Sequence, residues 1–209
     1  EKEKRPGGML MNGIPSFRLE KDVINAEIDV LREMGVEFRC GVEVGEDITI
    51  AQLREQGYKA FYIAIGAQGG RMTGVPGEDA VGVETGVDFL RRVNLNEEGV
   101  KLSGKTVVIG GGNVAVDVAR TALRTGSSDV SMFCLESRDI MPAADDEVAE
   151  AEEEGIVVNN SWGPKEILTE NGKVTAVVFK KCISVLDENK RFSPKYDEEE
   201  LLTVPCDQV

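Results

Sequence analysis

A strand–turn–helix–strand pattern in the middle of the sequence constrains the fold of this chain more than any other feature. An apolar run, Lys105–Ile109, leads into a glycine turn, Gly110–Ala115, and a helical pattern covers Asn113–Arg124. A second apolar run, Asp129–Leu135, follows. The turn fits the spacing G-x-G-x-x-A, which joins a strand to a helix in dinucleotide-binding units. The sequence therefore predicts two parallel strands joined by a helical crossover.

The glycine turn has the residue types that bind a pyrophosphate. Gly110 permits the tight turn, Gly112 lets the backbone approach the phosphates, and Ala115 lets the helix pack closely on the strand. N–H groups from about Asn113 to Val116 would face the phosphates at the positive end of the helix dipole. The alternative is a glycine-rich turn that holds no ligand. The predicted dinucleotide-binding residues here are Gly110, Gly111, Gly112, Asn113, Val114 and Ala115.

The charged residues after the second strand indicate which dinucleotide binds. An acid there accepts hydrogen bonds from the ribose hydroxyls of NAD, whereas an arginine pairs with the 2′-phosphate of NADP. Glu136 stands at the strand end, and Arg138 follows two positions later. Glu136 favours NADH, while Arg138 keeps NADPH open. The alternative for both side chains is that they are solvated charges with no ligand.

The elements around this unit predict an α/β fold with a Rossmann-like dinucleotide-binding domain. An acidic helix, Asp145–Glu154, and a third strand, Ile156–Val158, extend the β-α-β pattern. The periodicity then changes to that of an antiparallel β-meander, whose predicted strands are Pro164–Thr169, Lys173–Leu186 and Leu201–Val204. The residues of the glycine-turn helix that we expect to face inward are Val114, Ala115, Val118, Ala119 and Ala122.

The first 94 residues predict a mixture of loops, helices and strands. Residues 6–19 are too rich in glycine and proline for a helix, so we expect a loop there. The polar stretch 94–103 resembles a linker, and Asp197–Glu200 resembles a flexible loop. The predicted helices are Lys21–Met34, Ile50–Gln56 and Thr85–Val93, and the predicted strands are Val36–Cys40 and Ala60–Ile65, the second as a buried parallel strand.

Composition excludes several classes of function. The net charge of −14 argues against nucleic acid and anionic membrane surfaces as partners, and no apolar run is long enough to span a membrane. The four cysteines form no CxxC pair, so we expect no metal site, and free thiols suit the cytoplasm. The absence of histidine excludes Ser–His catalysis. Hydride transfer between a nicotinamide and a flavin needs no protein acid, so we predict no catalytic side chain.

Several short segments, spread along nearly the whole chain, resemble one family. They are Pro6–Leu10, Gly13–Leu19, Gly57–Ala67, Gly74–Glu78, Val87–Leu90, Gly110–Asp117 and Met141–Ala143. They resemble the small (beta) subunit of glutamate synthase and its relatives, FAD-dependent flavoproteins of the pyridine nucleotide–disulfide oxidoreductase type. The resemblance implies that a hydride passes from NAD(P)H to FAD and on to a partner subunit or another acceptor. The alternative is a catalytically inactive docking or electron-transfer module of a multi-subunit complex.

The resemblance also implies a domain organisation. In such proteins the nicotinamide domain is inserted into an FAD domain. Residues 1–94 would then be a partial FAD-binding segment with a crossing, residues 95–200 the NAD(P)-binding domain, and residues 201–209 the return toward the FAD domain. The residues implied to lie against FAD are Gly7, Gly8, Met9, Leu10, Val44 and Gly66, with Glu1 at its ribose.

The sequence departs from the family pattern in three places. It contains no G-x-G-x-x-G loop for the FAD pyrophosphate, so it resembles part of a longer flavoprotein, and we expect this chain alone to bind FAD weakly or not at all. Leu135–Glu136 stands where relatives usually have an Arg-Arg pair, which weighs against NADPH. The N-terminal iron–sulfur cysteines of the family are not in this sequence.

Overall fold

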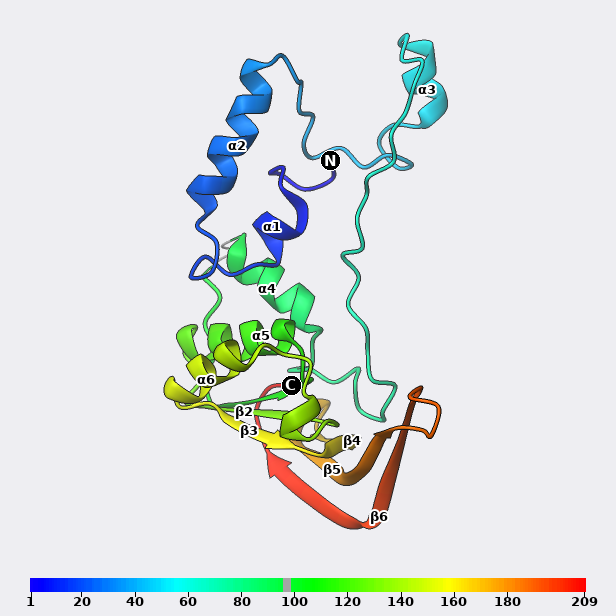
Figure 1. The fold of residues 1–209 in the computed structure, drawn as a ribbon. Coiled ribbons are helices and arrows are strands. Elements are labelled where there is room, and N and C mark those ends of the chain that lie inside the picture. The colour runs from blue at the N-terminus through cyan, green and yellow to red at the C-terminus, as the bar shows by residue number, and fades with distance from the viewer. Residues whose placement is uncertain (96–98) are drawn as a thin grey trace.

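The computed structural model describes residues 1–95 and 99–209. Figure 1 shows a parallel sheet covered by helices, an antiparallel sheet against it, and an extended N-terminal segment. The elements are α1 (Gly8–Asn12), α2 (Lys21–Glu33), α3 (Ile50–Glu55), α4 (Gly86–Asn94), β1 (Lys105–Ile109), α5 (Asn113–Arg124), β2 (Asp129–Cys134), the 3-10 helix η1 (Arg138–Ile140), α6 (Asp145–Glu153), β3 (Val157–Asn160), β4 (Trp162–Glu170), β5 (Lys173–Leu186) and β6 (Phe192–Pro205). Within these described ranges, no helix combines the length and apolarity that crossing a membrane requires.

The parallel sheet is the unit predicted from the glycine turn. Strands β1, β2 and β3 pair in that order, with Val107 opposite Ser131 and Phe133 opposite Asn159. Helices α5 and α6 cover one face of this sheet, and α4 packs against α5 on the same side, as Figure 1 shows. The core on this face includes Phe89, Val108, Val116, Ala119, Met132 and Val148. Burial of both sheet faces explains why β1 and β2 are almost continuously apolar.

The antiparallel sheet covers the other face and is the predicted meander. Strands β4, β5 and β6 pair in chain order. The β4–β5 hairpin turns at Asn171 and Gly172, whose φ angles of 52° and 76° are both positive, as a type I′ turn requires. Phe179 of β5 stacks on Phe133 of β2 with ring centroids 4.1 Å apart. This aromatic contact joins the two sheets.

The prediction of a flexible loop at Asp197–Glu200 was wrong, because this run lies inside β6. Lys181 pairs with Asp197 and Lys180 pairs with Leu201, so the residues between form a bulge. The Asp197 carboxylate accepts hydrogen bonds from the backbone N–H of Glu199 and Glu200. A bulge can accommodate a polar run within a strand because the extra residues need no cross-strand partner.

The N-terminal segment confirms the three predicted helices as α2, α3 and α4. The prediction that residues 6–19 contain no helix was wrong, because α1 forms there. Met11 of α1 is 1% exposed and packs on Ile24 and Ile28 of α2. Burial against a neighbouring helix thus overrides the low helix propensity of the glycines.

The two strands predicted in the N-terminal segment do not form. Ala60–Ile65 belongs to an extended crossing, the long line between α3 and α4 in Figure 1, and Tyr62 is 94% exposed. Val36–Cys40 is likewise irregular. A strand needs a neighbour to satisfy its backbone groups, and no strand in the described part of the chain pairs with either run. Of the predicted linker 94–103, Asn94 belongs to α4, and residues 96–98 lie outside the described residues.

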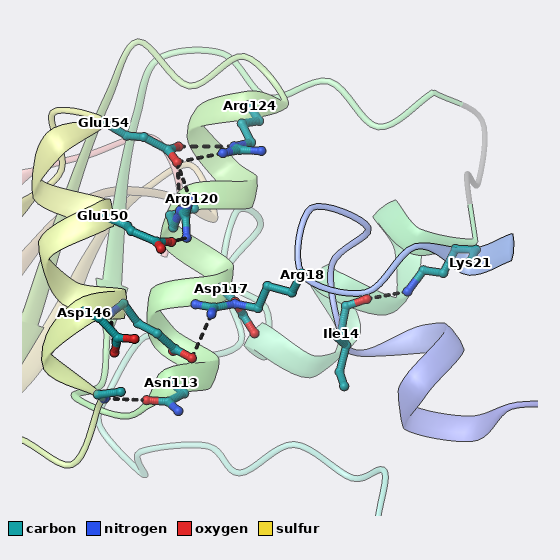
Figure 2. Close-up of polar contacts among 12 residues, drawn as sticks. Ile14, Arg18, Lys21, Asn113, Asp117, Arg120, Arg124, Asp146, Glu150 and Glu154 are labelled. Atoms are coloured by element: carbon teal, nitrogen blue, oxygen red, sulfur yellow. Dashed lines mark hydrogen bonds and ion pairs between the residues drawn. The ribbon is translucent and has the colours of Figure 1, made fainter. Parts of the chain in front are cut away.

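Arg18, in the loop between α1 and α2, connects the N-terminal segment to the parallel-sheet unit (Figure 2). Its guanidinium pairs with Asp117 of α5 and, through Nη1, with Oε1 of Glu147 of α6 at 2.7 Å. The three side chains are only 12–20% exposed. Burial raises the pKa of Asp117 above its ordinary value, against the opposing effect of Arg18. The contact is therefore a largely buried ion cluster.

Phe17 strengthens the same connection from the neighbouring position. The guanidinium carbons of Arg120 and Arg124 lie 4.7 and 4.2 Å from its ring centroid. Both arginines belong to α5 and pair with Glu154 beyond α6, at 2.6 and 2.7 Å (Figure 2). Nη1 of Arg120 also pairs with Oε2 of Glu150 at 2.5 Å, so part of the acidic run joins α6 to α5.

Candidate dinucleotide site

The glycine turn is the whole connection between β1 and α5, because β1 ends at Ile109 and α5 begins at Asn113. Gly110 has a φ of 151°, a conformation that side chains rarely adopt. A Cβ at Gly110 would lie 3.2 Å from the Cβ of Ala115. This close approach is the physical reason for a small residue at Ala115, because a larger one would push α5 away from the turn.

The first turn of α5 offers two N–H groups to a ligand. Gly112 is the N-cap residue, with φ −96° and ψ 172°, and no side chain caps the helix. The Gly112 carbonyl accepts hydrogen bonds from Ala115 and Val116, at 2.9 and 3.3 Å. The available donors are therefore Asn113 and Val114, a shorter run than the sequence predicted. A Cβ at Gly112 would meet nothing within 4 Å, so the space beside these donors is open.

The loop before α6 braces the glycine turn. The N–H of Ala143 donates to the carbonyl of Gly111 at 3.0 Å, and the N–H of Ala144 donates to Oδ1 of Asn113 at 2.8 Å (Figure 2). Sequence reasoning used Asn113 for its backbone alone and missed this side-chain role. The only sequence signal was the segment Met141–Ala143, which is among the family-like segments. The bond orients the first residue of α5 before any ligand binds.

A cavity of about 450 Å³ begins at the glycine turn. Val114 lines its mouth and is 53% exposed, so the prediction that Val114 faces inward was wrong. The deeper walls are mainly apolar and include Val107 of β1 and Val118 of α5. Beside them, Gln208 forms a parallel bridge with Thr106 along the outer edge of β1. The polar end formed by the turn is therefore the part of the cavity suited to a phosphate.

Glu136 lies beside the glycine turn. A Cβ at Gly111 would stand 2.9 Å from Oε2 of Glu136. The Glu136 carbonyl accepts hydrogen bonds from the N–H of Ser161 at 3.0 Å and from Nδ2 of Asn160 at 3.2 Å, which hold the end of β2 in place. The fold thus brings together the residues predicted for the pyrophosphate and the residue predicted for the ribose.

Arg138, the other predicted ribose-end residue, is bound to α6. Its Nη1 and Nη2 donate to Oε1 and Oε2 of Glu152 at 3.0 and 3.2 Å. The two side chains are 44% and 46% exposed. Sequence reasoning placed Glu152 on the acidic helix but gave it no partner.

The residues implied to contact FAD lie in three places of the N-terminal segment. Gly7 is the N-cap residue of α1 and Gly8 its first residue, with φ angles of 120° and 51°. Met9 and Leu10 follow and are 36% and 50% exposed. A Cβ at Gly8 would lie 4.0 Å from Gln68, so α1 is near the crossing that contains Gly66. Val44 is 53% exposed and lies in a separate turn. Glu1 pairs its backbone with Val42, close to this turn.

A family profile described as pyridine nucleotide-disulphide oxidoreductase matches residues 42–191. The chain belongs to this family. It is 37% identical, over 97% of its length, to the glutamate synthase [NADPH] small chain of Halomonas elongata, and covers 45% of that protein. It is also 37% identical, over 84% of its length, to the NAD-dependent dihydropyrimidine dehydrogenase subunit PreT of Escherichia coli K12, covering 41% of it. The chain therefore spans less than half the length of these relatives.

A solved structure has the same fold. FprA of Mycobacterium tuberculosis in complex with NADPH matches 100% of this chain and 61% of its own with a TM-score of 0.84, at 23% identity. This likeness concerns the fold alone, and it confirms the Rossmann-like α/β class expected from the sequence. The glutamate synthase-like resemblance is confirmed by the relatives. One relative is named for NADPH and the other for NAD, so their names do not decide which dinucleotide binds here.

Proposed function

We propose that this chain binds NAD(P)H as part of a flavin-dependent oxidoreductase, in which a hydride passes from the nicotinamide to FAD and on to a partner or acceptor. The glycine turn carries the proposal. The N–H groups of Asn113 and Val114 are uncapped, and open space lies beside Gly112. Two convergent donors at the positive end of α5 suit a pyrophosphate. Membership of the oxidoreductase family supports the reaction class.

The position of Glu136 favours NADH over NADPH. Its carboxylate lies next to Gly111, at the strand end where this fold holds the adenosine ribose. A carboxylate accepts hydrogen bonds from the 2′- and 3′-hydroxyls of NADH and repels the 2′-phosphate of NADPH. We therefore expect the chain to bind NADH more tightly.

Calorimetric titration of the 209-residue chain with NADH and NADPH tests the proposal. The decisive variant is Gly112→Asp, with Gly112→Asn as its matched control. Both residues are preferred at an N-cap, and the φ and ψ of Gly112 suit them, so both variants should fold. Asp adds a negative charge where the pyrophosphate would bind, whereas Asn does not. We expect both side chains to weaken NADH binding, because either one stands where the backbone must approach the phosphates, and Asp to weaken it more through its charge. NADH affinity that is unchanged in the Asp variant would contradict the proposal.

The N-terminal segment supplies the residues proposed to contact FAD. Gly8 and Gly66 both have positive φ, and a Cβ at Gly66 would meet nothing within 4 Å, so the backbone of Gly66 is open to a ligand. FAD, when bound, accepts a hydride and releases its electrons singly or as a pair. Gly7, Gly8, Met9 and Leu10 would lie against its ring system. The division into segments 1–94, 95–200 and 201–209 stays a prediction, as does weak FAD binding by this chain alone.

A partner subunit is proposed as the electron acceptor, because both relatives named above are chains or subunits of larger enzymes. The alternative is a docking module without catalysis. A pull-down that finds a tight partner, combined with no dinucleotide affinity, would favour that module. The four cysteines are all free, which agrees with the proposed cytoplasmic location.

A further inference from the structure

We propose that Glu152 on α6 is a specificity residue that selects against a 2′-phosphate by holding Arg138. The inference rests on the proposed function, since it assumes an adenosine ribose beside Glu136. The guanidinium of Arg138 forms a two-point pair with the Glu152 carboxylate, with N–O distances of 3.0 and 3.2 Å. This geometry occupies the Nη1–Nη2 edge, one of the two planar edges with which an arginine can bind a phosphate.

Arg138 is the cation that a 2′-phosphate would need. It follows Glu136 by two residues at the start of η1, directly beyond the end of β2. Both charges act on the buried thiol of Cys134 at that strand end: burial and the Glu136 carboxylate raise the pKa of Cys134, and Arg138 lowers it. The charge of Arg138 therefore acts at the Cys134 end of β2, which is where we expect the adenosine ribose to bind.

Glu152 changes what this cation can do. A phosphate could reach the Nη1–Nη2 edge of Arg138 only by displacing the carboxylate. At the other edge of the guanidinium, the phosphate would meet a cation whose charge Glu152 already offsets. Because both side chains are nearly half exposed, the pair is of moderate strength. The effect of the Arg138–Glu152 pair on NADPH binding is separate from that of Glu136. Glu136 lies beside Gly111, whereas the pair lies at α6.

Two fragments of the dinucleotides make the test specific to the adenosine end. These are 5′-AMP and 2′,5′-ADP, which differ only in the 2′-phosphate, and each is titrated into the chain by calorimetry at low ionic strength. Glu152→Gln should bind 2′,5′-ADP about two- to fivefold more tightly than the unaltered chain and leave 5′-AMP affinity unchanged. Glu153→Gln is the matched control, because it removes the same charge one position along. In the described part of the chain, Arg138 pairs with Glu152 and not with Glu153.

A second background separates the pair from general charge. In an Arg138→Gln chain, Glu152→Gln should give no gain for 2′,5′-ADP, because the cation that it releases is gone. The inference is overturned if Glu152→Gln still raises 2′,5′-ADP affinity in the Arg138→Gln chain, or if it raises that affinity no more than Glu153→Gln does. It is also overturned if Glu152→Gln gives no gain in the unaltered background. If 5′-AMP binds but Glu152→Gln has no effect, only this inference fails. If neither 5′-AMP nor NADH binds the unaltered chain, the proposed function fails as well.

Discussion

The carboxylate of Glu136 lies over the backbone of Gly111, so close that a Cβ on that glycine would stand 2.9 Å from Oε2. The same Cβ would lie 2.9 Å from the Cβ of Cys134 in β2. The glycine turn and the end of β2 are therefore in direct contact. The ribose and pyrophosphate ends of the candidate site form one packed unit rather than two separate loops.

This contact predicts that Gly111→Ala destabilises the fold. The Cβ of Cys134 is held by its strand and cannot move away cheaply, so we expect a loss of about 1–3 kcal/mol in the free energy of unfolding. Gly112→Ser is the control, because a Cβ there would meet nothing within 4 Å and serine is a preferred N-cap. Urea unfolding of the two variants measures the difference, and equal stabilities would contradict the packing described.

Arg18 should stabilise the chain more than an exposed arginine does. Arg18→Ala leaves the carboxylates of Asp117 and Glu147 largely buried without their cation, and we expect a loss of about 1–3 kcal/mol. Arg32→Ala is the control, because its pair with Asp29 is 49% and 62% exposed and should contribute less than about 1 kcal/mol. Urea unfolding measures both, and a loss no larger for Arg18 than for Arg32 would refute the prediction.

The pair between Arg124 and Glu154 should make stability depend on pH. The hydrogen bond from Arg124, joined by one from Arg120, lowers the pKa of Glu154 from 4.5 in spite of partial burial. A carboxyl group with a lowered folded pKa adds stability that is present above pH 4.5 and is lost as the pH falls through the folded pKa. Arg124→Ala should therefore cost more stability at pH 7 than at pH 3.5. An equal cost at both pH values would exclude this linkage.

The thiols should differ in reactivity. Burial raises the pKa of Cys206 to about 11 and also raises the pKa values of Cys134 and Cys182, so these thiols stay protonated and covered. Cys40 is only partly buried. At pH 8 we expect a disulfide reagent to label Cys40 alone in the folded chain and all four thiols in urea. Rapid labelling of a folded Cys40→Ser variant would contradict this.

The sequence predicted the central unit well because its signals are local. Three consecutive glycines, an apolar strand and a helical period determine β1, the turn and α5, and the predicted helix Asn113–Arg124 has the observed bounds. The Asn171–Gly172 turn is equally local, since positive φ at both positions suits these residue types. The position of Glu136 just beyond β2 was also predictable, because it depends only on where the strand ends.

Contacts between distant residues decided the rest. The glycine-rich opening becomes helical because Met11 packs on α2, and Ala60–Ile65 stays extended because no described strand pairs with it. Val114 points to the cavity rather than the core, and Asn113 binds Ala144 through its side chain. From the sequence, Arg138 was a candidate phosphate ligand, but in the structure Glu152 of α6 pairs with it. The sequence by itself determined which backbone conformations are allowed, whereas burial and charge pairing across the tertiary structure decided which surfaces and cations a ligand can reach.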